Sequence, residues 1–154
     1  MFWMLLACSG KAVDEPAGVE QPTPKLEPLA PVEPMQGSSL RMLLKAWHSD
    51  DVPGREVFDA HEDAVVQLME LARDDAEMIV RERAMLSLSL YPESPEAKTL
   101  LVGVVEGDEH AKLRAAALRG LGGWKADADV VALAESAKAD ADPRVQAAAA
   151  ALLE

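Results

Sequence analysis

Apolar residues recur three and four positions apart in the part of the chain from Ser39 to Glu154. Val80, Ala84 and Leu88, for example, would share one face of a helix, and this spacing is typical of amphipathic helices packed against a core. No run in this part alternates apolar and polar residues between turn signals, as a half-buried strand would. The pattern therefore predicts an all-α domain over residues 39–154.

The helical pattern also repeats along the chain. Three segments begin with an aspartate and then carry an aliphatic residue, an alanine and a leucine at equal offsets: Asp75, Val80, Ala84 and Leu88; Asp108, Leu113, Ala117 and Leu121; Asp140, Val145, Ala149 and Leu153. The step is 33 residues from Val80 to Leu113 and 32 residues from Leu113 to Val145. A second series keeps the same register through Leu68, Leu101 and Leu133. A period of this length predicts an α-solenoid of stacked helix pairs.

Turn residues divide the array into about three pairs, at roughly 63–91, 94–123 and 127–154. Proline follows Tyr91 and two glycines precede Trp124, which are the breaks expected between pairs. A helix pair cannot bury both of its apolar stripes alone, so each pair depends on its neighbours.

One more amphipathic segment, Leu40–Trp47, precedes the pairs. Its Leu40-Arg41 is a candidate for a degenerate copy of Val80-Arg81, but the spacing to the first pair is several residues off. The spacing favours instead an N-terminal capping helix, with Trp47 and Phe58 as bulky plugs.

Residues 80–88 and 113–122 resemble HEAT repeats, most closely the short HEAT-like kind named after phycobilisome lyases. The resemblance implies a right-handed solenoid whose Val-Arg helices line the concave side. It also implies a structural role for the turn aspartates, which would bond neighbouring backbone or the next repeat's arginine: Asp75, Asp108 and Asp140, with Arg81 and Arg114. Gln146 stands where a third arginine is expected.

The N-terminal residues Leu5-Leu6-Ala7-Cys8 resemble a bacterial lipobox, in which a lipid is attached to the cysteine and the chain is cleaved before it. Residues 1–7 would then be a signal segment, although their apolar run is short and no basic residue precedes it. The alternative is an accidental apolar N-terminus with a spare cysteine. By the same resemblance, Ser9 after the cysteine implies an outer-membrane lipoprotein of the bacterial cell envelope that faces the periplasm.

Residues 8–38 would form the lipidated cysteine and a disordered tether. Six prolines and four glutamates are interleaved between Lys11 and Ser38, which disfavours helices and central strands and leaves no apolar period. A secreted chain with an ordinary disordered tail is the alternative.

Composition narrows the possible functions. The net charge of −12 disfavours nucleic-acid binding, which depends on many Lys and Arg contacts to phosphates. Cys8 is the only cysteine, so neither an intrachain disulfide nor a cysteine-based zinc site can form. His61-Glu62 begins like a zinc-protease motif, but Val65 stands where the second histidine must be. We expect no metal, no cofactor and no catalytic residue.

The concave face is the remaining candidate site. Arg81, Glu82, Arg114 and Arg119 would lie on or near it and could bind a carboxylate-bearing partner, although a structural role in the repeats is the favoured interpretation of Arg81 and Arg114. The sequence thus predicts a non-enzymatic protein–protein interaction or scaffold module, lipid-anchored through Cys8 only, with an unknown protein partner. A lyase-type enzyme or chaperone subunit acting on a cofactor-bearing protein is the alternative function. We expect a monomer or a weak homo-oligomer.

Overall fold

The computed structural model describes residues 39–47, 53–108 and 110–154. These residues belong to one compact unit, Met35–Glu154, and their regular elements are all helical, which confirms the all-α prediction. The elements are α1 (Leu40–Ala46), α2 (Arg55–Asp59), α3 (Ala64–Asp74), α4 (Met78–Leu88), α5 (Pro95–Gly107), α6 (Ala111–Gly120), the short 3-10 helix η1 (Leu121–Trp124), α7 (Ala128–Ala137) and α8 (Pro143–Leu152). The predicted signal segment, Cys8 and the tether lie outside the described residues.

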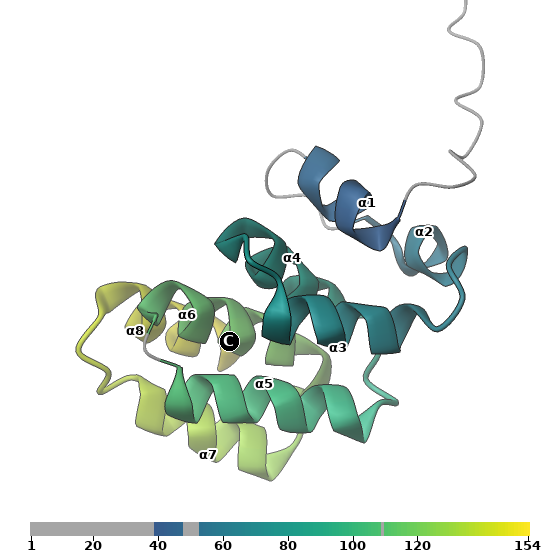
Figure 1. Ribbon diagram of the computed structural model, residues 1–154. Helices are drawn as coiled ribbons and strands as arrows, with labels where there is room; N and C mark the ends of the chain where they lie inside the picture. Colours follow the sequence, from purple (N-terminus) through teal and green to yellow (C-terminus); the bar gives the residue numbers. More distant parts are fainter. Residues whose placement is uncertain (1–38, 48–52, 109) are drawn as a thin grey trace, which may run out of the picture. The chain divides into compact units, whose positions relative to one another are not determined.

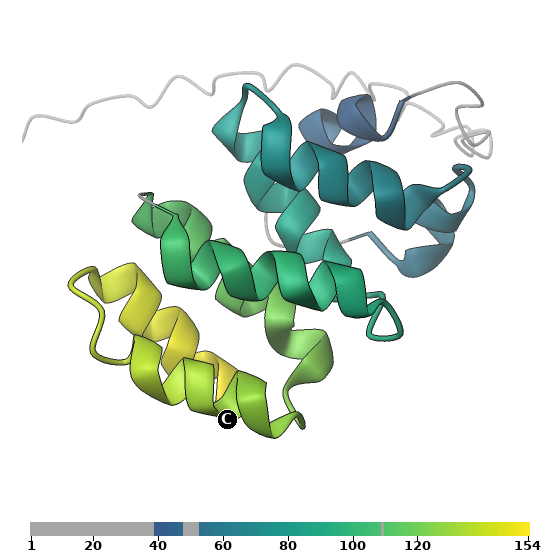
Figure 2. The same cartoon turned by 60° about the horizontal axis from the view of Figure 1, so that its bottom comes forward.

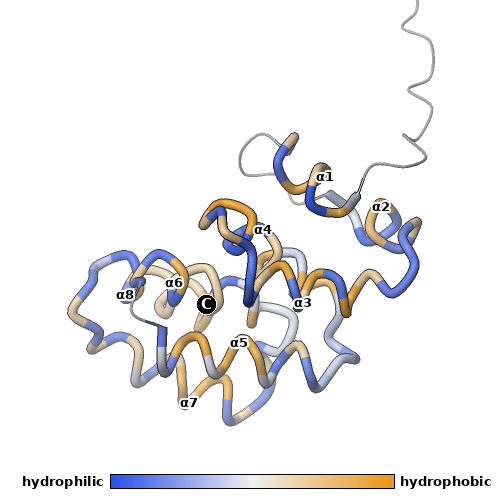
Figure 3. The backbone as a smooth tube through the Cα atoms, viewed as in Figure 1, coloured by the Kyte–Doolittle hydropathy of each residue, from blue (hydrophilic) through white to orange (hydrophobic). Residues whose placement is uncertain are grey.

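Three helix pairs stack in two layers, as the α-solenoid prediction requires. Helices α3, α5 and α7 form one layer, here called the outer layer, and they lie in a row in Figure 2. Helices α4, α6 and α8 form the other, here called the inner layer, which lies above the outer layer in Figure 1. Hydrophobic residues recur along the helices, whereas the turns between them are mostly hydrophilic (Figure 3).

Local sequence explains where two of the later helices begin. Helix α5 starts with Pro95 in its first turn, and the hydroxyl of Ser94 accepts a hydrogen bond from the Ala97 amide at 3.2 Å. Helix α8 starts in the same way, with Pro143 in its first turn and Asp142 accepting from the Arg144 amide at 2.9 Å. A proline in the first turn gives up no helical hydrogen bond, and the capping oxygen satisfies one of the free amides.

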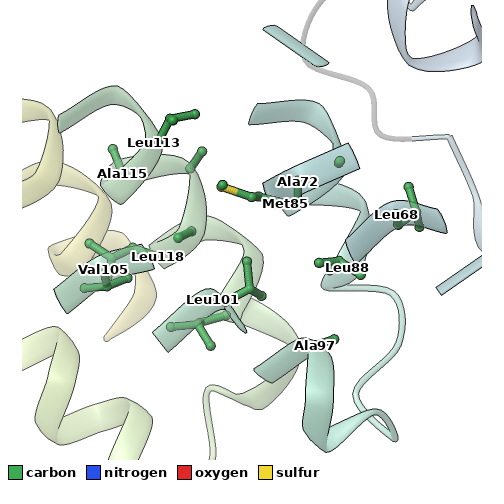
Figure 4. Close-up of a cluster of buried hydrophobic side chains, with 14 of the residues drawn as sticks. Leu68, Ala72, Met85, Leu88, Ala97, Leu101, Val105, Leu113, Ala115 and Leu118 are labelled. Carbon is green, nitrogen blue, oxygen red and sulfur yellow. The ribbon is translucent and has the colours of Figure 1, made fainter. Parts of the chain in front are cut away.

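The repeated apolar positions form the interior of the stack. Val80, Leu113 and Val145 are fully buried, and so are the three repeated alanines, Ala84, Ala117 and Ala149. Side chains from α3, α4, α5 and α6 meet in one cluster, part of which is shown in Figure 4. Each large aliphatic side chain buried in this way contributes about 1.5–3 kcal/mol to folding.

The outer-layer register differs by one residue in the third pair. Leu68 and Leu101 are fully buried, but it is Ala134 that is fully buried in α7, whereas Leu133 is only half-buried. The spacing from Leu101 to its counterpart is therefore 33 residues rather than the 32 that the leucines suggest. The position on the helix face therefore decides which residue is buried, even though the neighbouring Leu133 is the larger apolar residue.

Two glycines allow the inner layer and the following turn to approach α4 closely. A Cβ atom at Gly120 would collide with the Met85 carbonyl oxygen, and one at Gly123 would lie 2.5 Å from the Ser89 carbonyl oxygen.

Contacts between successive inner-layer helices are more extensive than those between successive outer-layer helices. In the outer layer, open grooves of about 410 and 620 Å³ lie between α3 and α5 and between α5 and α7. The inner layer therefore lies on the concave side of the stack.

Helix α1 covers the N-terminal side of the inner layer. Its Leu40 and Leu44 are buried, and it packs against α4 and α3. The Arg83 side chain of α4 donates to the carbonyl oxygen of Leu44 at 2.5 Å and so binds the end of α1. Of the two expected plugs, Phe58 is fully buried and Trp47 is half-buried against the core.

Candidate interaction surface

The three turn aspartates have equivalent backbone contacts. The Oδ1 atoms of Asp75, Asp108 and Asp140 accept hydrogen bonds from the backbone amide two residues later, at 2.8, 2.7 and 2.8 Å respectively. This side-chain bond closes the turn between the two helices of a pair, a role that suits aspartate because its short carboxylate reaches the amide at the start of the second helix.

Each turn aspartate also forms an ion pair with an arginine of an earlier helix, which is α1 for Asp75, α4 for Asp108 and α6 for Asp140. Nitrogen–oxygen distances are 2.6 Å for Arg41–Asp75, 3.1 Å for Arg81–Asp108 and 2.9 Å for Arg114–Asp140. Of the two contacts expected for the turn aspartates, the bond to neighbouring backbone is confirmed. The expected bond to the next repeat's arginine is wrong in direction, because the arginine that pairs with each aspartate comes from an earlier helix of the stack.

The ion pairs stabilise the ionised carboxylates. The hydrogen bond from Arg41 lowers the pKa of Asp75, and the hydrogen bond from Arg114 lowers the pKa of Asp140. The pKa of Arg114 is raised in turn, chiefly by its hydrogen bond to Asp140. These four side chains are therefore charged at neutral pH and held in the joints between successive repeats.

Gln146 occupies the arginine position of the last pair and keeps half of the arginine's bonding. Its Nε2 atom donates to the Asp140 carbonyl oxygen at 2.7 Å, just as Nη1 of Arg114 donates to the Asp108 carbonyl oxygen at 2.9 Å. The uncharged amide of Gln146 thus keeps the hydrogen bond to the carbonyl oxygen of the turn aspartate in its own helix pair.

Helix α1 shares this bonding pattern. Arg41 contacts Asp75 as Arg81 contacts Asp108, and it also donates to Glu77 at 2.7 Å. Helix α1 therefore caps the array with the contacts of an inner-layer repeat helix, although 40 residues separate Arg41 from Arg81. The reading of Leu40-Arg41 as a degenerate Val-Arg copy, which the spacing disfavoured, matches these contacts.

Arg119 is placed differently from the other predicted arginines. It is exposed near the end of α6 and lines a groove of about 220 Å³ between the α6–η1 segment and α8. The groove is lined by two cationic side chains and four small or apolar residues: Arg119, Lys125, Gly122, Ala148, Ala151 and Leu152. No carboxylate lines it.

The family model for HEAT repeats matches residues 65–154, more than half of the chain. The chain belongs to the HEAT-repeat family. No curated protein and no solved structure matches it. HEAT repeats are typical of protein–protein interaction scaffolds, which bind along the extended surface of the stack.

Within the HEAT domain, the predicted surface residues separate into two groups. Arg81 and Arg114 lie in the ion pairs described above, and Glu82, whose side chain is 14% exposed, pairs with Lys112 at 2.8 Å. Only Arg119 of the four is an exposed side chain on the groove. Lys125 was missed by the sequence analysis, because it follows two glycines and no periodic signal assigns it to a face.

The described part of the HEAT domain has no cluster of three or more His, Cys, Asp and Glu side chains suited to hold a metal ion. Where the structure is described, no helix combines the length and apolarity that a bilayer crossing requires.

Proposed function

We propose that the protein is a non-enzymatic interaction module whose HEAT domain binds a protein partner through the inner layer. The observation that carries the proposal is the groove at Arg119 and Lys125, where exposed cations flank an apolar floor in a HEAT-repeat chain. A binding surface of this kind needs an apolar contact area and unpaired polar groups that fix the orientation of the partner.

We propose further that a lipid on Cys8 holds this module at the bacterial envelope, at the outer membrane and facing the periplasm. The support is the lipobox resemblance of Leu5-Leu6-Ala7-Cys8 and the proline- and glutamate-rich segment that follows it. A tether of this composition would keep the domain away from the lipid surface, because prolines keep it extended and the glutamates are repelled by anionic headgroups.

Metabolic labelling with an alkyne fatty acid tests the anchor. In a bacterial host, the full-length protein is expected to carry the label and to enter the detergent phase of a temperature-induced phase separation. Cys8→Ala should abolish both, and Cys8→Ser is a second control that keeps the size of the side chain. Equal labelling of all three proteins would remove the anchor from the proposal. Density-gradient separation of the membranes then assigns the labelled protein to the outer or inner membrane.

A further inference from the structure

Most of the cationic side chains in the domain are already occupied. Residues 39–154 contain thirteen Lys and Arg and twenty-two Asp and Glu. Ten of the thirteen, all within the described residues, donate to a carboxylate or a backbone carbonyl: Arg41, Lys45, Arg55, Arg81, Arg83, Lys98, Lys112, Arg114, Lys138 and Arg144. Arg73, Arg119 and Lys125 have no such partner among the described residues. Two of these three line one groove.

The groove combines these charges with an apolar surface. Ala148, 3% exposed, and the half-buried Leu152 belong to α8, whereas Arg119 and Lys125 stand at the end of α6 and just after η1. Gly122 leaves the groove open between them, because a Cβ atom there would meet no heavy atom within 4 Å. A molecule that fills the groove would therefore touch apolar carbon on one side and two cations on the other.

We propose that this groove binds a segment of a partner protein in which apolar side chains stand beside acidic ones. The proposal rests on the proposed function and names the chemistry of its partner. A leucine-sized side chain covers Ala148 and Leu152, and flanking carboxylates accept hydrogen bonds from Arg119 and Lys125. Outside the groove the surface of the domain is mostly acidic and repels an acidic segment. Charge therefore also favours the groove over the rest of the surface as the binding site.

A membrane surface fits the same groove less well. An anionic bilayer approaches a broad face rather than a hollow of about 220 Å³. The excess of acidic over basic residues in the domain opposes that approach, since lipid-binding surfaces need clusters of Lys and Arg.

Fluorescence anisotropy with a defined probe tests the proposal. The probe is a fluorescein-labelled peptide, Gly-Ser-Glu-Glu-Leu-Leu-Glu-Glu-Ser-Gly, and the protein is the full-length chain carrying Cys8→Ser, so that no lipid competes. We expect a dissociation constant of roughly 10 µM to 1 mM. Replacement of the four glutamates by glutamine is expected to weaken binding about tenfold, and binding should weaken as salt is raised.

Variants locate the site. Arg119→Ala and Lys125→Ala are each expected to weaken binding about threefold, and the double variant about tenfold, as for exposed ion pairs. Arg73→Ala removes the third unpaired cation, which lies outside the groove, and should leave the affinity unchanged. Gly122→Leu should fill the groove and abolish binding while the melting temperature is kept, because the new side chain enters open space.

Three results would overturn the proposal: no binding at 1 mM protein, equal binding of the glutamine peptide, or equal affinity of the double variant and the Arg73→Ala control. Sedimentation with anionic phosphatidylglycerol vesicles is the second arm, and vesicle binding lost in the double variant would make a membrane the occupant instead. None of these results affects the fatty-acid label on Cys8, so failure of this inference is distinguishable from failure of the proposed anchor.

Discussion

Replacement of Gly120 by alanine should separate two helices that now touch. Gly120 is the last residue of α6, and an added Cβ atom would lie well inside the contact distance of the Met85 carbonyl oxygen in α4. It would also lie 3.2 Å from both terminal methyl carbons of Leu101 in α5. Because a helix backbone faces it on one side and a fully buried leucine on the other, α6 cannot relax by a side-chain rotation alone.

The size of the effect follows from two opposing terms. Glycine to alanine in a helix is favourable by about 0.5–1 kcal/mol, because alanine loses less backbone entropy on folding. Overpacking of a filled interior typically costs about 1–3 kcal/mol. We expect Gly120→Ala to lower the free energy of unfolding by about 1–2 kcal/mol, which for a domain of this size lowers the melting temperature by roughly 4–8 °C.

Gly103→Ala is the matched control. Gly103 is exposed in the middle of α5, and a Cβ atom there meets nothing within 4 Å. The same substitution should therefore stabilise the protein by about 0.5–1 kcal/mol. Urea unfolding followed by far-ultraviolet circular dichroism measures both. If Gly120→Ala proves as stable as Gly103→Ala, the inner helices do not approach each other as described.

Three further predictions concern the core, the ion pairs and the groove. Leu101→Asp should unfold the array, since it places an unpaired charge at a fully buried position; a cooperative, native-like melt would contradict the assigned packing. Arg41→Ala should lower the melting temperature at pH 7 but much less in acid. The pKa of Asp75 is depressed by Arg41, so the pair's contribution is present above the unfolded pKa of about 3.9 and is lost as pH falls through the lower folded value; a constant difference between pH 7 and pH 2 would refute this. Arg119→Ala should change stability by less than about 0.5 kcal/mol, as an exposed residue without a partner, and a larger loss would assign it a structural role.

The interior of the repeats could be predicted from the sequence because burial imposes a period. Val80, Leu113 and Val145 must be apolar and must recur at the length of one helix pair, so their spacing in the chain reports their positions in the stack. The turn aspartates were predictable for the same reason, since each closes an equivalent turn.

Spacing alone misjudged the features that depend on contacts between elements. The spacing disfavours Arg41 as a repeat residue, because extra chain, including α2, separates it from the first pair. Arg41 nevertheless pairs with Asp75, since that contact depends on where α1 packs and not on its distance along the sequence. In α7, Leu133 and Ala134 are both apolar, so the pattern could not decide which of them faces the core.

The groove was predictable only in part. Arg119 could be singled out because the repeat pattern leaves it unexplained, but its neighbour Lys125 has no periodic position. Lys125 reaches the groove because η1 continues the chain beyond α6 in a tight turn, with Gly123 against the Ser89 carbonyl oxygen of the preceding pair. The course of the chain from α6 through η1 to Lys125 depends on backbone geometry, which cannot be predicted from the apolar pattern of the sequence.

Site-specific photo-crosslinking in living cells tests the central claim, that the HEAT domain binds a partner through its inner layer. A photoreactive amino acid is placed in the full-length chain at Ala151, which lines the groove, or at Val66, which is 50% exposed on the outer-layer helix α3. The account predicts a discrete protein adduct from position 151 that is lost when Arg119→Ala and Lys125→Ala are combined, and no such adduct from position 66. An adduct of equal yield from position 66, or none from position 151, would contradict it.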